Sequence, residues 1–179
     1  MKKINIIDGI IADIDERGYA EISISDTITE IPIDIDNESY CYDDDRYYTS
    51  CIADFIEQNS IKNIKIIGGG ENLKDISKLF SFCTNLQSVD LTEFNTSNIK
   101  NMSYMFLDCE NLKTVKFGVL PGLFKIPNNI NMEYMFEGCP NFESMHLFNI
   151  NTSIKRMDEM YDQCSNDIGV MFKQVSLFV

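Results

Sequence analysis

The chain has 179 residues, of which 28 are acidic and 15 are basic, and its formal net charge is −13 at pH 7. A surface this negative repels the phosphates of DNA, RNA and anionic lipids, so we expect no direct binding to nucleic acid or to a membrane. Hydrophobic residues make up 44% of the chain, which is enough to bury the core of a folded domain and excludes an unfolded acidic chain.

The sequence contains no arrangement typical of an enzyme, a metal centre or a membrane span. His146 is the only histidine, and no Cys or Asp stands beside it at a recognisable spacing, so we expect no catalytic residue, no metal and no cofactor. No stretch approaches the ~20 apolar residues of a membrane-spanning helix, and Asp8 interrupts the apolar run near the start. We therefore expect a cytoplasmic protein of the producing cell or of an infected host, with a surface location only if an export signal was removed.

Residues 1–49 predict a small acidic β cap. Two alternating apolar runs flank the turn-forming sequence Glu16-Arg17-Gly18, which indicates a β-hairpin. Residues 1–60 hold 15 of the acidic side chains and only four basic ones. Almost all of the net negative charge therefore belongs to this end of the chain.

The densest acidic stretch of the cap has three interpretations. Its residues are Asp34, Asp36, Glu38, Asp43, Asp44 and Asp45. The simplest interpretation is a solvated loop that aids solubility. A calcium loop fits the spacing of Asp34, Asp36, Glu38 and Asp45, but Ser39 stands where an EF-hand requires glycine. The third interpretation is an acidic surface that engages a basic groove of a nucleic-acid-binding protein.

A repeat begins near residue 50. Four cysteines, each preceded by apolar residues at −7, −4 and −3, mark successive units: Cys83, Cys109, Cys139 and Cys164. These offsets place four side chains on one face of a short helix. A strand pattern follows each unit, as in Leu86-x-x-Val89-x-Leu91, and an imperfect leading unit ends at Ile66. Gly68-Gly69-Gly70 occupies the place of a phosphate loop but lacks its remaining residues, which favours a tight corner.

The motif M-x-x-M-F-x-x-C-x-N-L at Met102–Leu112 resembles the BspA-like leucine-rich repeat, and the resemblance covers about residues 50–179. It implies a right-handed solenoid with parallel strands and functions in protein binding and adhesion rather than catalysis. We therefore predict an α/β repeat fold: a short leucine-rich-repeat solenoid of about five helix–strand coils over residues 50–179, with an N-terminal β-hairpin cap over residues 1–49.

The outward positions of the predicted strands form a candidate surface for a protein partner. One outward column consists of Lys65, Asp90, Lys116, His146 and Ser176. The last strand, Val175–Val179, ends the sequence as an apolar strand, and its edge predicts either strand addition or a homodimer.

We therefore expect a non-enzymatic protein–protein interaction module that uses the strand face, the loops and the acidic cap. One alternative is an intracellular inhibitor from a phage or mobile element, similar in kind to an anti-CRISPR protein, whose acidic cap occupies a basic nucleic-acid-binding groove. Another alternative is a fragment of a surface adhesin.

Overall fold

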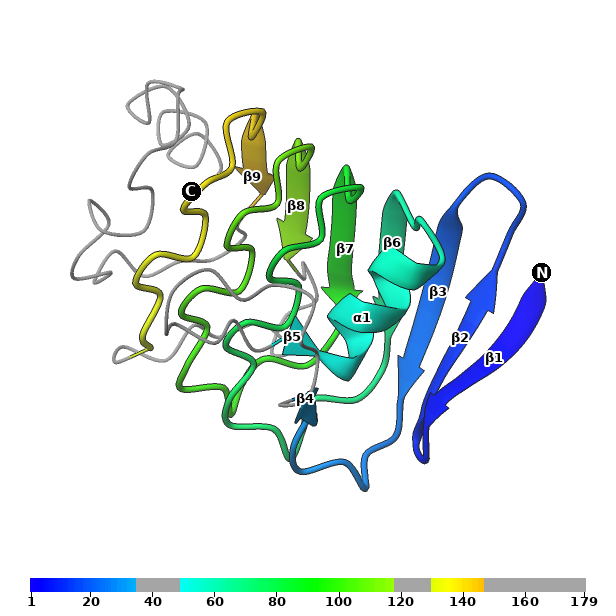
Figure 1. Cartoon of the computed structure of the whole chain (residues 1–179). Coiled ribbons are helices and arrows are strands. Elements are labelled where there is room, and N and C mark those ends of the chain that lie inside the picture. The colour runs from blue at the N-terminus through cyan, green and yellow to red at the C-terminus, as the bar shows by residue number, and fades with distance from the viewer. Residues whose placement is uncertain (35–48, 118–129, 147–179) are drawn as a thin grey trace.

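A mixed β-sheet dominates the fold. The computed structural model describes residues 1–34, 49–117 and 130–146 (Figure 1). Across the main sheet the strand order is β1 (Lys2–Ile7), β2 (Ile10–Ile14), β3 (Tyr19–Ile24), β6 (Asn63–Ile67), β7 (Ser88–Glu93), β8 (Thr114–Phe117) and β9 (Ser144–His146). A separate pair consists of β4 (Ile33–Asp34) and β5 (Thr49–Ser50). The described part of the chain contains one helix, α1 (Cys51–Gln58).

The first three strands form an antiparallel meander. The expected turn at residues 16–18 joins β2 to β3. The Asp15 carboxylate stabilises this turn by accepting the backbone N–H groups of Arg17 at 2.8 Å and Tyr19 at 3.0 Å. These two donors lower the pKa of the Asp15 carboxyl. Gly18 supplies the positive φ of 79° that closes the turn.

The sheet changes from antiparallel to parallel at β3. Tyr19 of β3 lies beside Asn63 of β6, and β6, β7, β8 and β9 then pair in parallel. Along each strand, apolar residues are buried at alternate positions, as in Ile64, Val89 and Val115, which share one register. The buried side chains point to one face, and the polar residues between them point to the other.

Helix α1 covers part of the buried face (Figure 1). Its N-cap is Ser50, whose hydroxyl accepts the Ala53 N–H at 3.0 Å. Ile52, Phe55 and Ile56 are buried in the same core cluster as the inward side chains of the sheet.

The segments predicted as the other helices are chains of β-turns. We call residues 75–83, 101–109 and 131–139 the first, second and third turn segments. In the segment that ends at Cys83, Leu79 N–H bonds to Ile76 O and Ser81 N–H bonds to Lys78 O, both across three residues. Lys78 lies in the left-handed region with φ of 58°, and Tyr104 and Tyr134 repeat this conformation with φ of 56°. A residue with positive φ cannot belong to a continuous right-handed helix.

The predicted α/β solenoid of about five helix–strand coils is therefore wrong. The described residues form a β-dominated structure with a single short helix, and the predicted hairpin cap is continuous with the main sheet. Neither a leucine-rich-repeat solenoid nor a BspA-like architecture is supported by this arrangement. The strands predicted from the repeat at Ile64, Val89, Val115 and Met145 are nevertheless present.

The turn segments hydrogen-bond to one another rather than internally along a helix. Ile76 N–H donates to Asn101 O at 3.0 Å, and Phe80 N–H donates to Met105 O at 2.9 Å. Each segment starts at an Asx turn, in which the side chain of Asp75, Asn101 or Asn131 accepts the N–H two residues later. The residues at offsets 0, 3, 4 and 7 are buried in these turns, just as they would be on one face of a helix. The hydrophobic pattern alone therefore predicted the wrong kind of element.

Buried cysteines also join successive turn segments. The Cys109 thiol donates to Phe80 O and the Cys139 thiol donates to Phe106 O, both at 3.0 Å. Both cysteines are free and buried. The repeated cysteine is thus explained by a small, largely apolar side chain that also bonds to a buried carbonyl.

We expect Cys83 and Cys109 to resist alkylation in the folded protein. Burial raises the pKa of both thiols well above the usual range, so the reactive thiolate is scarce as well as inaccessible. Iodoacetamide at pH 8 should label them more than about tenfold more slowly than in urea, as measured by peptide mass spectrometry. Equal labelling rates in the two conditions would contradict their burial.

Candidate binding surfaces

A row of charged residues crosses the open face of the main sheet. Adjacent strands place Glu21 beside Lys65, Lys65 beside Asp90, and Asp90 beside Lys116. We call these four residues the charged row. Strand β9 continues the register, because the Cα of His146 lies opposite that of Lys116. Four of the five residues predicted for the strand face are therefore brought together.

Two contacts hold side chains of this face in place. Lys65 Nζ lies 2.6 Å from Glu93 Oε1, and this ion pair raises the pKa of the Lys65 ammonium group. Tyr19 Oη donates to Glu21 Oε1 at 3.0 Å. Burial and the bond to Glu21 both raise the pKa of Tyr19. The face therefore carries charges of both signs in fixed positions, and Lys116 is exposed at the end of the row.

A second row on the same face consists of hydroxyl and amide side chains. Asn63, Ser88, Thr114 and Ser144 lie side by side in the register of the parallel strands. Ser88 Oγ donates to Asn63 Oδ1 at 2.7 Å. Such groups can both donate and accept hydrogen bonds, so this row offers adaptable contacts next to the charged row.

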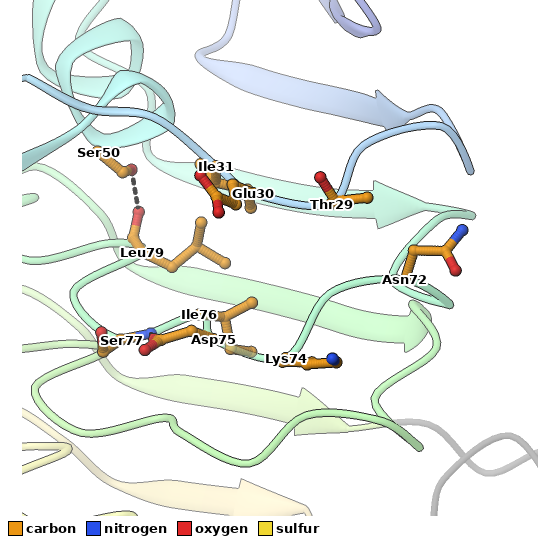
Figure 2. Close-up of a pocket in the computed structure, with 10 residues that line it drawn as sticks. All are labelled: Thr29, Glu30, Ile31, Ser50, Asn72, Lys74, Asp75, Ile76, Ser77 and Leu79. Carbon is orange, nitrogen blue, oxygen red and sulfur yellow. Dashed lines mark hydrogen bonds between the residues drawn. The ribbon is translucent and has the colours of Figure 1, made fainter.

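A groove of about 650 Å³ lies away from this face, between residues 29–31 and the first turn segment (Figure 2). Its lining residues are Thr29, Glu30, Ile31, Ser50, Asn72, Lys74, Asp75, Ile76, Ser77 and Leu79. The volume falls within the ~300–1,000 Å³ that is usual for ligand sites. Glu30 and Lys74 are both exposed at its rim.

Most of the predicted acidic site lies outside the described residues. Asp34 belongs to β4, where its backbone pairs with Thr49. The other acidic candidates, Asp36, Glu38, Asp43, Asp44 and Asp45, lie outside the described ranges, as do Ser176 and the predicted edge strand Val175–Val179. Within those ranges, no group of three or more His, Cys, Asp or Glu residues is placed to hold a metal ion. The described part of the chain also contains no helix long and apolar enough to cross a membrane.

The sequence interpretation missed Tyr19, Glu21 and Glu93 as members of the polar face. Glu21 enters the charged row because β3 pairs with β6, and no local pattern reveals which strand lies beside the first repeat. Glu93 reaches Lys65 because the register shifts between Lys65 and Ile67, so that Ile67 pairs with Glu93. The alternating pattern of Tyr19–Ile24 was the only available signal, and it indicates that Tyr19 and Glu21 share one face of their strand.

Comparison with models of known protein families gives a match. The family model described as Mycoplasma protein of unknown function, DUF285, matches residues 57–170. This range covers more than half of the chain and includes β6, β7, β8, β9 and the turn segments between them. No curated protein and no solved structure matches the chain.

Proposed function

The chain belongs to the DUF285 family of Mycoplasma proteins of unknown function, and we propose that it is a non-enzymatic module that binds a protein partner through the open face of its sheet. The charged row is the observation that carries this proposal. Its members, Glu21, Lys65, Asp90 and Lys116, present both signs of charge on adjacent strands. A protein surface of complementary pattern can match such a row, whereas a nucleic acid requires a mainly basic face.

The size of the face is compatible with this function. Seven strands spaced ~4.8 Å apart and ~17 Å long give a flat area of roughly 500 Å². Surface relief enlarges this area towards the ~800 Å² that each partner contributes to a standard interface. The three N-terminal strands are needed to reach this size, because the four parallel strands alone give about half of it.

The cytoplasm is the compartment that we propose for this binding. The described part of the chain has four cysteines, and all four are free: Cys51, Cys83, Cys109 and Cys139. Reduced thiols are the usual state in the cytosol, whereas exported proteins of this size commonly use cysteines in disulfides.

We expect the Lys116→Glu variant to bind its partner about tenfold more weakly than the wild-type chain. Lys116 is exposed at the end of the charged row, so reversing its charge repels a complementary partner without disturbing the core. The measurement is crosslinking of purified bait in a lysate of the producing organism, with quantitative mass spectrometry of the recovered proteins.

Lys100→Glu is the matched control, since Lys100 is an exposed lysine outside the sheet and the substitution changes the net charge by the same amount. A partner recovered equally by all three baits would contradict binding through the strand face. Failure of the wild-type bait to enrich any protein over Lys116→Glu would also count against the proposal.

A further inference from the structure

The turn segments pair through a regular row of carbonyl groups. Asn101 O and Ser103 O accept the N–H groups of Ile76 at 3.0 Å and Lys78 at 3.1 Å. The next pair of segments repeats this pattern, because Asn131 O and Glu133 O accept from Met102 and Tyr104 at 2.7 and 3.0 Å. In the second and third turn segments, carbonyls two residues apart thus accept hydrogen bonds from the turn segment before them.

The first turn segment has the same row of carbonyls, but the unit before it consists of β5 and α1 rather than another turn segment. Asp75 O and Ser77 O correspond to Asn101 O and Ser103 O, yet they accept no hydrogen bond from any residue in the described ranges. Only the third carbonyl of the row, Leu79 O, is paired, because Ser50 Oγ donates to it at 2.7 Å (Figure 2). Among the residues that the structure describes, two acceptors at the repeat spacing therefore have no donor.

The residues that carry these acceptors, Asp75 and Ser77, line the groove of about 650 Å³. The groove is bridged at one end by the Ser50–Leu79 bond and at the other by Asn72 Nδ2, which donates to Asp26 O at 2.6 Å. Between these bridges, no hydrogen bond among described residues joins residues 29–31 to residues 74–77. The gap is thus the place that a further hydrogen-bonded segment would take.

The side chains around the groove suit a peptide. Figure 2 shows Glu30 and Ile31 on one side, facing Ile76 and Leu79 on the other. Ile76 and Leu79 are almost fully buried and form an apolar floor, while Lys74 adds a positive charge at the rim opposite in sign to Glu30. An anionic ligand such as a phosphate is disfavoured because the open backbone groups of residues 75 and 77 are both acceptors.

We propose that this groove binds an extended peptide segment of a partner protein, whose alternate N–H groups donate to Asp75 O and Ser77 O. Only a polypeptide strand supplies N–H donors at the two-residue spacing that the repeat itself uses. This site is separate from the charged row on the open face of the sheet. A partner can engage either surface without the other.

The test uses a peptide that the structure supplies. A fluorescein-labelled, C-terminally amidated peptide copies residues 100–107, because Met102 and Tyr104 in that segment already donate to the equivalent carbonyls of the next segment. Its matched control is the same peptide methylated at the backbone nitrogens of those two residues, which removes both donors and keeps every side chain. We expect the methylated peptide to bind the full chain about tenfold more weakly in fluorescence polarisation.

A pair of protein variants locates the binding. Glu30→Trp places a bulky side chain in the groove at an exposed position and should abolish binding, whereas Lys100→Trp, also exposed but outside the groove, should not. Circular dichroism melting is the control that checks whether both variants fold. Equal binding of the two peptides, unchanged binding to Glu30→Trp, or no binding of the unmodified peptide would each overturn the proposal. If the chain dimerised, if Glu30→Trp abolished that dimer and if the peptide did not bind, the groove would be assigned to a second copy of the chain. That result would also overturn the proposal.

Discussion

The Gly70→Ala variant is expected to lose more than about 4 kcal/mol of folding free energy, enough to unfold a marginally stable domain. Gly70 has a φ of +95°, and a Cβ atom there would overlap the backbone carbonyl oxygen of Asn95 and lie 2.9 Å from the ring of Phe94. The obstacle is mainly backbone, which cannot move aside as a flexible side chain can. Urea denaturation followed by circular dichroism measures the loss.

Gly68→Ala is the matched control, two residues away in the same corner. Gly68 also has a positive φ, of +67°, but a Cβ atom there would meet nothing within 4 Å. Its substitution should therefore show only the ~1–2 kcal/mol of the left-handed conformation. Similar losses at Gly68 and Gly70 would show that close packing of this corner against Asn95 is not what requires glycine.

The Phe106→Ala variant is expected to lose about 3–5 kcal/mol, the usual range for a buried phenylalanine. Phe106 is fully buried between two stacked rings, with centroid distances of 5.3 Å to Phe80 and 5.2 Å to Phe136. Truncation leaves a cavity and removes both aromatic contacts, each of which contributes about 0.5–1.5 kcal/mol. For a chain of this length the melting temperature should fall by roughly 10 °C.

A Phe106→Leu variant separates the effect of lost side-chain volume from the effect of lost aromatic stacking. Leucine fills most of the cavity, so we expect a loss of about 1–2 kcal/mol in the same thermal and urea measurements. If Phe106→Ala lost less than about 1 kcal/mol, the stacked column of rings would contribute little to stability, contrary to its burial.

The strands of the repeat could be predicted from sequence because their signal is local. A period of two with apolar residues at Val89 and Leu91 identifies both the strand and its buried face. Aligning equivalent positions of successive repeats then gave the register of Lys65, Asp90 and Lys116. This part of the candidate surface therefore required no knowledge of the tertiary structure.

The turn segments could not be predicted from hydrophobic spacing, because a helix and a chain of turns bury the same offsets. The signal that distinguishes turns from a helix here comes from the polar residues at the start of each segment. Asp75, Asn101 and Asn131 start the three described segments, and their side chains favour Asx turns over helix interiors. Gly138 is a further signal, because glycine has a low helix propensity, and in the structure it has a left-handed conformation with φ of 69°.

The part of the candidate surface contributed by β3 depended on a long-range pairing. Nothing in the sequence near Tyr19 or Glu21 specifies that β3 lies beside Lys65. The carbonyl row of the groove was equally hidden, since backbone acceptors carry no sequence signature. What makes Asp75 O and Ser77 O available is the position of their segment as the first of the turn ladder.

The change from antiparallel to parallel pairing at β3 also orders the folding reaction. Strands β1, β2 and β3 pair across short turns, so they can associate in about 1–10 μs, the usual time for a hairpin. Pairing of Tyr19 with Asn63, in contrast, must close a loop more than forty residues long before the parallel strands can join this meander. Because closure entropy grows only with the logarithm of loop length, this distance weakens the equilibrium by little. Its main effect is on rate, with the antiparallel meander formed early and the parallel strands joined to it in a later, slower step.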